Sequence, residues 1–164
     1  TLPPGARPGA LPTVIWEASL ASWRRHFPTA RGFRHLLWSD ANLSECLREA
    51  FPRHLAAFEA LPGGIERADV GRYCVLHLHG GVYADLDYEA REAFFAELPP
   101  DRASLLECRN REPSIEVENA LMASPPGHLL WPMLLEATFG AGGRHRWDDV
   151  RGGTGPRTLT AVVR

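Results

Sequence analysis

Residues Ile65 to Tyr88 read IERADVGRYCVLHLHGGVYADLDY, and this stretch decides how the fold is interpreted. Apolar residues recur at three- and four-residue spacing through 65–78, which predicts a helix, and Gly80-Gly81 predicts its end. The β-prone run 82–84 predicts a short strand, followed by Asp85-Leu86-Asp87. In an extended chain Asp85 and Asp87 point to the same side. Two neighbouring carboxylates suit a hard divalent cation, Mg²⁺ or Mn²⁺, which completes its shell with water and phosphate oxygens.

The context of this Asp-x-Asp motif makes it more informative than the motif alone, which is often a pair of solvated loop acids. The predicted helix carries Arg67, Asp69 and Arg72. The predicted strand places the two acids at its C-terminal end, where ligands bind in open α/β sheets. For Asp69 and Arg72, a weak surface ion pair is the structural alternative to a binding role.

Four blocks of the sequence together resemble glycosyltransferase family 32. The central block is I-x-R-A-D-x-x-R-Y-x-x-L-x-x-x-G-G-V-Y-A-D-L-D. Upstream, Ser22-Trp23-Arg24-Arg25-His26-Phe27-Pro28 and Leu37-Trp38-Ser39-Asp40 resemble S-W-R-x-x-N-P and L-W-(T/S)-D. Downstream, residues 118–128 resemble x-N-A-x-M-A-S-x-x-G-H, and Thr154-Gly155-Pro156 with Leu159-Thr160 resembles T-G-P … L-T. The blocks keep the family's order from about Ser22 to Thr160.

The resemblance implies an α/β fold of the GT-A type, which is a Rossmann-like mixed sheet flanked by helices, and a retaining transferase that uses a nucleotide-sugar donor. It implies that Asp69 accepts hydrogen bonds from sugar hydroxyls, and that Arg67 or Arg72 meets sugar oxygens or phosphate. The predicted catalytic residues are Asp85, Asp87 and Asn119, with Asp85 and Asp87 also as ligands of Mn²⁺ or Mg²⁺. The predicted substrate-binding residues are Arg67, Asp69, Arg72, Tyr83, Trp38 and Glu118; for Trp38 a place in the core is the alternative, and for Asn119 a turn cap.

The first twelve residues depart from the family. They hold four prolines and two glycines and predict a loop or extended lead-in. Family members usually open with a strand of the type I-P-K-I-I-H-Q-x-W, and nothing here matches it. Two interpretations are open: the chain is a fragment, or its nucleotide pocket is built differently. The expected organisation is therefore a lead-in over 1–12 and one GT-A-like domain over 13–164, truncated at its ends in the first interpretation.

Local patterns predict the remaining elements. Asp40 is the expected N-cap of a helix through Ala50, and the glycine-rich, arginine-rich segment 139–157 is expected to be a loop, either an ordinary surface loop or one that closes over a diphosphate. The other expected elements are helices over 16–27, 52–61, 89–98 and after His128, and strands over 33–38, 103–108 and 115–123.

Bulk properties set limits on the function. The chain has 164 residues, which suits one domain, and a net charge of −2, which argues against nucleic acid as a partner. Cys46, Cys74 and Cys108 lack metal-ligand spacing and are expected to be buried or free thiols, as in a reducing compartment. No apolar run has transmembrane length. We expect a cytoplasmic location, with peripheral membrane association left open, or the Golgi lumen if an N-terminal anchor has been lost.

The sequence thus predicts a metal-dependent transferase that moves a hexose from UDP- or GDP-sugar to a hydroxyl of a glycan, a lipid or a protein, with retention. One alternative is a truncated, non-catalytic domain that binds a donor or a partner. Another is a metal-dependent phosphohydrolase that acts on nucleotide sugars.

Overall fold

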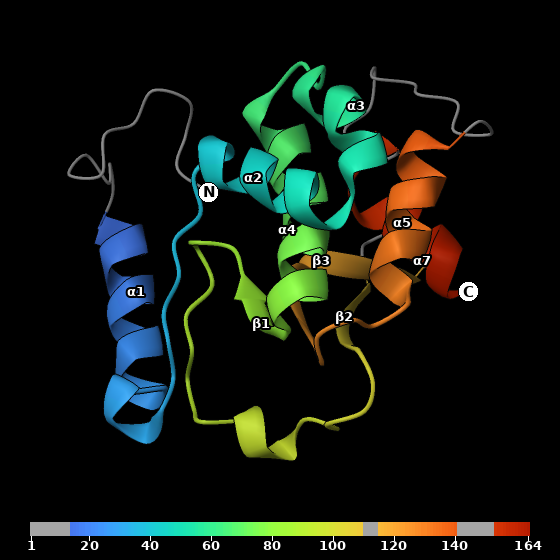
Figure 1. The fold of residues 1–164 in the computed structure, drawn as a ribbon. Coiled ribbons are helices and arrows are strands. Elements are labelled where there is room, and N and C mark those ends of the chain that lie inside the picture. The colour runs from blue at the N-terminus through green and yellow to red at the C-terminus, as the bar shows by residue number, and fades with distance from the viewer. Residues whose placement is uncertain (1–13, 110–114, 141–152) are drawn as a thin grey trace.

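A long central helix organises the structure, a computed structural model that describes residues 14–109, 115–140 and 153–164 (Figure 1). The helices are α1 (Val14–His26), α2 (Asp40–Ala50), α3 (Leu55–Glu59), α4 (Gly64–His79), α5 (Leu130–Phe139) and α7 (Pro156–Val163). Single 3₁₀ turns cover Thr29–Arg31, Pro52–His54 and Phe95–Glu97, and the strands are β1 (Gly81–Ala84), β2 (Ser104–Arg109) and β3 (Ile115–Ser124). The predicted α/β class is confirmed, and the arrangement is consistent with part of a GT-A-like domain.

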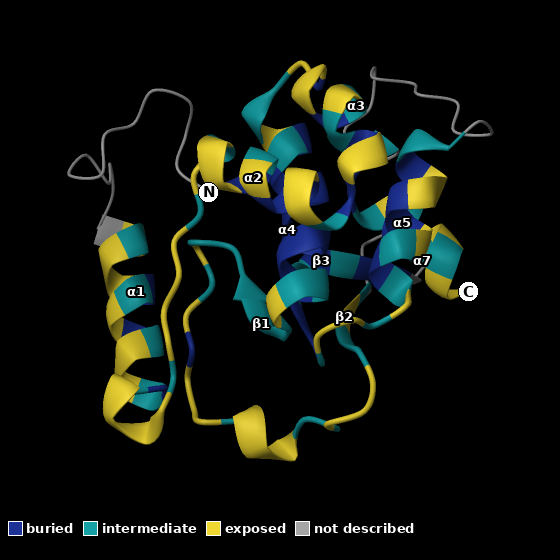
Figure 2. Ribbon diagram, in the orientation of Figure 1, coloured by how far each residue is buried: buried dark blue, intermediate teal, exposed yellow. Residues whose placement is uncertain are grey.

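Helix α4 is buried around most of its circumference, as its dark blue middle in Figure 2 shows. On one side it packs against α2, α3 and α5 through Val70, Cys74 and Val75. On the other side Tyr73 and Leu76 join a second cluster with residues of β3, α5 and α7. Because α4 is covered on both sides, its polar side chains Asp69 and Arg72 are buried as well.

The turn after α4 explains the glycine pair in the sequence. Gly80 and Gly81 have φ values of 62° and 84°, a region that L side chains rarely adopt. A Cβ atom on Gly80 would also lie 2.6 Å from the backbone nitrogen of Pro126. The turn therefore requires glycine at position 80, and it leads the chain directly from α4 into β1.

The three described strands form one sheet in the order β1-β3-β2. Both pairs are antiparallel, whereas the resemblance implied a mixed sheet. Gly81 pairs with Ser124 and Ala84 with Leu121, while β2 pairs from the other side of β3 with residues 115–118, 122 and 123. In this sheet β1 is therefore an edge strand.

Two predicted elements are wrong. Residues 33–38 are extended but pair with no described strand, so the predicted strand does not form. The predicted helix over 89–98 is irregular apart from the turn Phe95–Glu97. Contacts with α1 explain the second error: Ala90 N–H donates to Ser22 Oγ (2.9 Å), and Trp23 Nε1 donates to the Tyr88 carbonyl (2.7 Å). These tertiary bonds outweigh the local helix preference.

The start of α2 also differs from the prediction, by one residue. Ser39, not Asp40, is the N-cap, and it forms a capping box with Asn42. Asp40 instead accepts a hydrogen bond from Arg67 Nε at 2.9 Å, which ties α2 to α4.

The other predicted elements are confirmed within a few residues of their predicted bounds, as α1, the turn Pro52–His54 with α3, α4, β1, β2, β3 and α5. Most of the predicted basic loop over 139–157 lies outside the described residues. Cys46 and Cys74 are buried thiols and Cys108 is partly exposed. Among the described helices, none has both the length and the apolar character needed to cross a membrane.

Candidate functional site

Arg72 lies at the centre of a polar network inside the protein. Its side chain is 5% exposed, and its guanidinium donates to the carbonyls of Asn119 (2.6 Å) and Ala68 (3.2 Å). Its Nη2 lies 3.0 Å from Asp69 Oδ1, and its Nη1 lies 3.4 Å from Asp85 Oδ1. A buried arginine is tolerated only when its N–H donors have acceptors. Here α4, β3 and the residue that follows β1 provide those acceptors.

Asp69 receives hydrogen bonds from three segments of the chain. Asn119 Nδ2 donates to its Oδ1 at 2.8 Å, and Thr154 Oγ1 donates to its Oδ2 at 2.9 Å. Arg72 provides the third contact, from the next turn of α4. The carboxylate thus fixes the position of Asn119 and of the chain before α7 relative to the central helix.

Burial and charge shift the pKa values in this network in defined directions. Burial raises the pKa of Asp69, against the opposing effects of Arg72, Thr154 and Asn119. Burial alone lowers the pKa of Arg72, but its neighbours Tyr83, Asp69 and Asp85 together raise it. Burial also raises the pKa of Tyr83, so its phenol stays protonated and can donate.

Tyr83 and Asp85 form the exposed side of the network. The Tyr83 hydroxyl donates to Asp85 Oδ1 at 2.8 Å, and the Arg72 guanidinium carbon lies 4.8 Å from the centre of the Tyr83 ring. The Asp85 side chain is 33% exposed. Asp85 is thus oriented by two neighbours, and part of it still faces solvent.

Asp87 lies in a turn, which corrects the geometry expected from the sequence. Strand β1 ends at Ala84, and Tyr88 N–H donates to the Asp85 carbonyl at 3.0 Å. The Asp85-Leu86-Asp87 stretch is therefore bent, and the expectation that an extended chain points both carboxylates to one side is wrong. Asp87 is exposed, and no described residue contributes an ion pair to it.

The chemistry of these two acids fits a hard divalent cation. The described residues contain no group of three or more histidine, cysteine, aspartate or glutamate side chains that would enclose a metal. Mg²⁺ and Mn²⁺ are commonly held by one or two carboxylates, with water and substrate phosphates as the other ligands. Asp87 is available for such a role, while Asp85 is already held by Tyr83 and Arg72.

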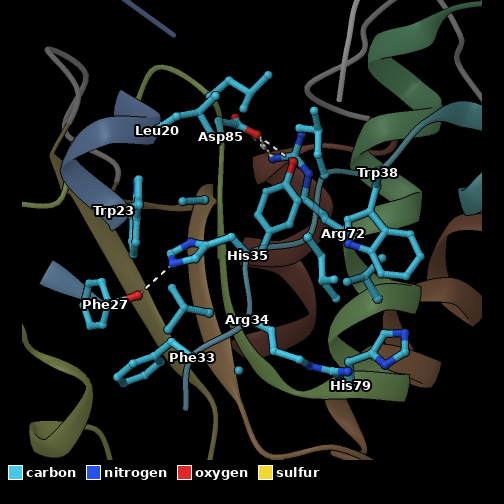
Figure 3. Close-up of a pocket in the computed structure, with 18 of the residues that line it drawn as sticks. Leu20, Trp23, Phe27, Phe33, Arg34, His35, Trp38, Arg72, His79 and Asp85 are labelled. Atoms are coloured by element: carbon cyan, nitrogen blue, oxygen red, sulfur yellow. Dashed lines mark hydrogen bonds and ion pairs between the residues drawn. The ribbon is translucent and has the colours of Figure 1, made fainter. Parts of the chain in front are cut away.

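A cleft of about 430 Å³ opens beside this network. Its walls come from α1, residues 32–38, α4 and residues 80–86. Figure 3 shows Arg72 and Trp38 on one side of this cleft and Trp23 with Phe27 on the other. Trp38 lines the cleft and also packs against the core cluster of α2 and α4, so both expected roles of this residue agree with its position.

Two predicted site residues lie apart from the network. Arg67 contacts Asp40 and the carbonyl of Leu61 (3.0 Å), so it serves the packing of α2 on α4. Glu118 precedes Asn119 on β3, at the irregularity in the pairing of β3 with β2, and makes no described contact with the network. There its charge adds to burial in raising the pKa of Tyr88.

Two residues of the network were not predicted as site residues. Thr154 is completely buried and belongs to the Thr154-Gly155-Pro156 block, which is the signal that points to it. Tyr73 was interpreted only as part of the apolar stripe of α4, yet its hydroxyl donates to the Thr154 carbonyl at 3.0 Å. Both residues hold the chain before α7 against Asp69.

Known glycosyltransferases are similar to this chain in sequence. The sequence profile described as "Glycosyltransferase sugar-binding region containing DXD motif" matches residues 13–105. Mannosyl phosphorylinositol ceramide synthase SUR1 of Saccharomyces cerevisiae is 32% identical over 135 residues, 79% of this chain and 33% of the relative. Inositol phosphoceramide mannosyltransferase 1 of Schizosaccharomyces pombe is 33% identical over 72 residues, 44% of this chain and 23% of the relative. The chain thus spans a third or less of the length of these relatives.

Proposed function

This chain belongs to the family of glycosyltransferase sugar-binding regions that contain a DXD motif, and from that premise we propose that it transfers a hexose from a nucleoside-diphosphate sugar to a hydroxyl acceptor. The observation that carries the proposal is the network in which Arg72 joins Asp69, Asn119 and Asp85 beside an open cleft. Sugar hydroxyls and phosphates need donors and acceptors fixed in advance, and this network supplies both.

The donor diphosphate is proposed to bind at the Asp85-Leu86-Asp87 turn. Asp87 would hold a divalent cation, Mn²⁺ or Mg²⁺, with Asp85 assisting directly or through water. The cation would supply Lewis-acid stabilisation of the negative charge on the departing diphosphate. Within the chain, Tyr83 and Arg72 keep Asp85 in one orientation, which reduces the reorganisation needed when the donor arrives.

The sugar is proposed to bind against Asp69, Arg72 and Asn119. Among the described residues, Thr154 alone donates a hydrogen bond to Asp69 Oδ2, and a carboxylate oxygen can accept two, so this oxygen keeps acceptor capacity inside a buried side chain. Tyr83 and Trp38 provide ring surfaces along the cleft for the donor. Glu118, which precedes Asn119 on β3, is proposed to contact the acceptor.

For the acceptor, the names of the relatives suggest the first compounds to test. They are mannosyltransferases of inositol phosphoceramide, so a mannosyl donor and a lipid that carries inositol phosphate are the proposed pair. We propose retention of the anomeric configuration. In that step the bond from the anomeric carbon to the diphosphate breaks, the acceptor oxygen bonds to the same face, and the hydroxyl proton leaves with the diphosphate.

The test is calorimetric titration of GDP-mannose, UDP-glucose, UDP-galactose and UDP into the purified chain, with and without Mn²⁺, followed by assays with inositol phosphoceramide. Metal-dependent binding of one donor and transfer of its sugar are expected. Binding without transfer would favour a donor-binding domain, and steady donor breakdown without acceptor would favour a phosphohydrolase. A folded chain that binds none of the donors would overturn the proposal.

A further inference from the structure

Two buried thiols meet between α2 and α4, which pack against each other (Figure 1). Cys46 of α2 and Cys74 of α4 are 4% and 0% exposed and belong to the same core cluster. A hydrogen bond between the two side chains raises the pKa of Cys74, and burial raises it further. Two sulfur atoms that share a hydrogen bond are in contact, so the two side chains point towards each other.

The packing of α2 on α4 explains why the two thiols meet. Gly71 lies one turn before Cys74, and a Cβ atom there would lie 2.5 Å from Cδ1 of Leu43, which lies one turn before Cys46. The missing side chain of Gly71 therefore lets the two helices approach closely beside the thiols. The hydrogen bond that ties the start of α2 to α4 lies one turn earlier again on both helices, so the contacts keep one register along the pair.

The surroundings of the two thiols limit their chemistry. Their neighbours in the cluster are apolar and include Leu47, Val70 and Val75. A closed zinc site needs four ligands, whereas the described residues contain no group of even three histidine, cysteine, aspartate or glutamate side chains that could hold a metal. Oxidation to a disulfide needs only the two cysteines, with their side chains directed at each other.

We propose that Cys46 and Cys74 form a reversible disulfide that joins α2 to α4. The oxidant is a small-molecule disulfide such as glutathione disulfide. One protein thiolate attacks the oxidant, whose S–S bond breaks and releases one thiol, and the second protein thiolate then attacks the mixed disulfide and releases the other. The two protein thiols lose two protons and two electrons, and the oxidant takes them up as two thiols. This inference is independent of the proposed sugar transfer.

Burial determines when the exchange occurs. The thiolate is the attacking species, and the raised pKa of Cys74 keeps its thiolate fraction low in the closed structure. Exchange therefore requires α2 to separate from α4, and the disulfide opposes that separation once it has formed. Trp38, just before α2, packs against the same cluster and lines the cleft. The disulfide would therefore hold one wall of the cleft in place as well as the core.

Mass spectrometry after oxidation tests the crosslink directly. The folded chain is incubated with millimolar glutathione disulfide, in buffer and in urea below the unfolding transition, and the remaining thiols are alkylated before digestion with trypsin. The three cysteines fall in separate tryptic peptides, 35–48, 73–91 and 103–109, so the pairing can be identified. The expected product joins 35–48 to 73–91 and leaves 103–109 outside the crosslink. Dithiothreitol should restore all three thiols.

Thermal unfolding of matched variants measures the effect of the crosslink. Cys46 and Cys74 lie 28 positions apart in the chain, and a disulfide across such a loop should raise the unfolding midpoint by roughly 5–10 °C. Cys108→Ala keeps the pair and should show this rise on oxidation. Cys46→Ala removes one thiol and should show no rise, and Cys74→Ala replaces it as the test if circular dichroism shows that Cys46→Ala does not fold.

Any of three results would overturn the proposal. The first is that peptides 35–48 and 73–91 stay unlinked at every urea concentration below the transition. The second is a crosslink that involves Cys108 in equal or greater amount. The third is an unfolding midpoint that does not rise on oxidation of the wild type, because the helices would then have to move out of their packing to form the bond.

Discussion

Arg72 combines a structural role with a proposed role in binding the donor. Its charge is buried, and Asp69, Asp85 and two backbone carbonyls compensate for it. Removing one partner of a buried pair leaves the other uncompensated, which costs about 3–5 kcal/mol. We therefore expect Arg72→Met to lower the free energy of unfolding in urea by about that amount.

The matched control is Arg102→Met. Arg102 is 71% exposed and contacts Asp101, its neighbour in the chain, so its removal should change the stability by less than about 0.5 kcal/mol. A loss of similar size in both variants would contradict the structural role assigned to Arg72.

Asp87 is expected to affect binding without affecting stability. It is exposed and is the proposed ligand of the divalent cation. Asp87→Asn should abolish the Mn²⁺-dependent part of donor binding in calorimetry and leave the urea midpoint close to that of the wild type. Asp101→Asn, another exposed acid, should change neither. Unchanged metal-dependent binding in Asp87→Asn would remove the ligand role from this residue.

The raised pKa of Asp69 makes the free energy of unfolding decrease as the pH rises. Burial raises its pKa in the folded state above 3.8, its ordinary value. Between these two pKa values the folded protein binds more protons than the unfolded chain, so this contribution to stability falls as pH rises. The stabilising contribution of Asp69 is complete below pH 3.8 and is lost once the pH exceeds the pKa of Asp69 in the folded protein.

The measurement is the difference in unfolding free energy between the wild type and Asp69→Asn over a range of pH. This difference should decrease as pH rises from about 3 and then level off, since the asparagine does not titrate. A difference that increases with pH would show that the pKa of Asp69 is lowered in the folded protein.

At the scale of whole elements, the Gly80 turn connects α4 to β1. A Cβ on this residue meets both a positive φ and the backbone of Pro126. Gly32 has a φ of 86°, but no described atom lies within 4 Å of the point that its Cβ would occupy, so a substitution there has only the conformational cost. Gly80→Ala should therefore destabilise the protein by clearly more than Gly32→Ala, which should cost about 1 kcal/mol. Thermal unfolding of the two variants checks this, and equal losses would contradict the steric role of Pro126.

The sequence predicted those elements whose local pattern agrees with their tertiary contacts. The apolar stripe of 65–78 and the glycine pair were sufficient for α4 and its end. Segment 33–38 carries a strand pattern, but a strand needs a partner, and local sequence does not show whether one is present. Residues 89–98 look helical, yet Ser22 and Trp23 bind their backbone from a distant part of the chain.

The candidate site was predictable for a similar reason. Asp69, Arg72, Tyr83, Asp85 and Asn119 lie in the motif blocks that resemble the family, and the structure brings all five together. Arg67 lies in the same block, but its side chain contacts Asp40 of α2 instead of the network, and the motif alone does not show on which side of α4 it lies. The role of Tyr73 depends on Thr154, which is 81 residues away in the chain, and no local pattern reports such a contact.

At the scale of the whole molecule, the Tyr73 hydroxyl connects the central helix to the chain before α7. Both groups of this hydrogen bond are buried. Tyr73→Phe removes the donor and leaves the Thr154 carbonyl without this partner, which should cost about 1–3 kcal/mol. Tyr88→Phe is the control, because no described residue accepts a hydrogen bond from the Tyr88 hydroxyl. Urea unfolding should separate the two variants, and equal stability would show that the bond contributes little.

The hydrogen bond from Thr154 to Asp69 closes a loop of 85 residues. The chain loses entropy when such a distant pair is brought together, and that loss precedes the gain from the contact. The carboxylate proposed to meet the sugar is therefore fully assembled only after most of the chain has condensed. A ligand that selects the assembled carboxylate would stabilise the entire fold by mass action, and its affinity would be readable in the unfolding midpoint.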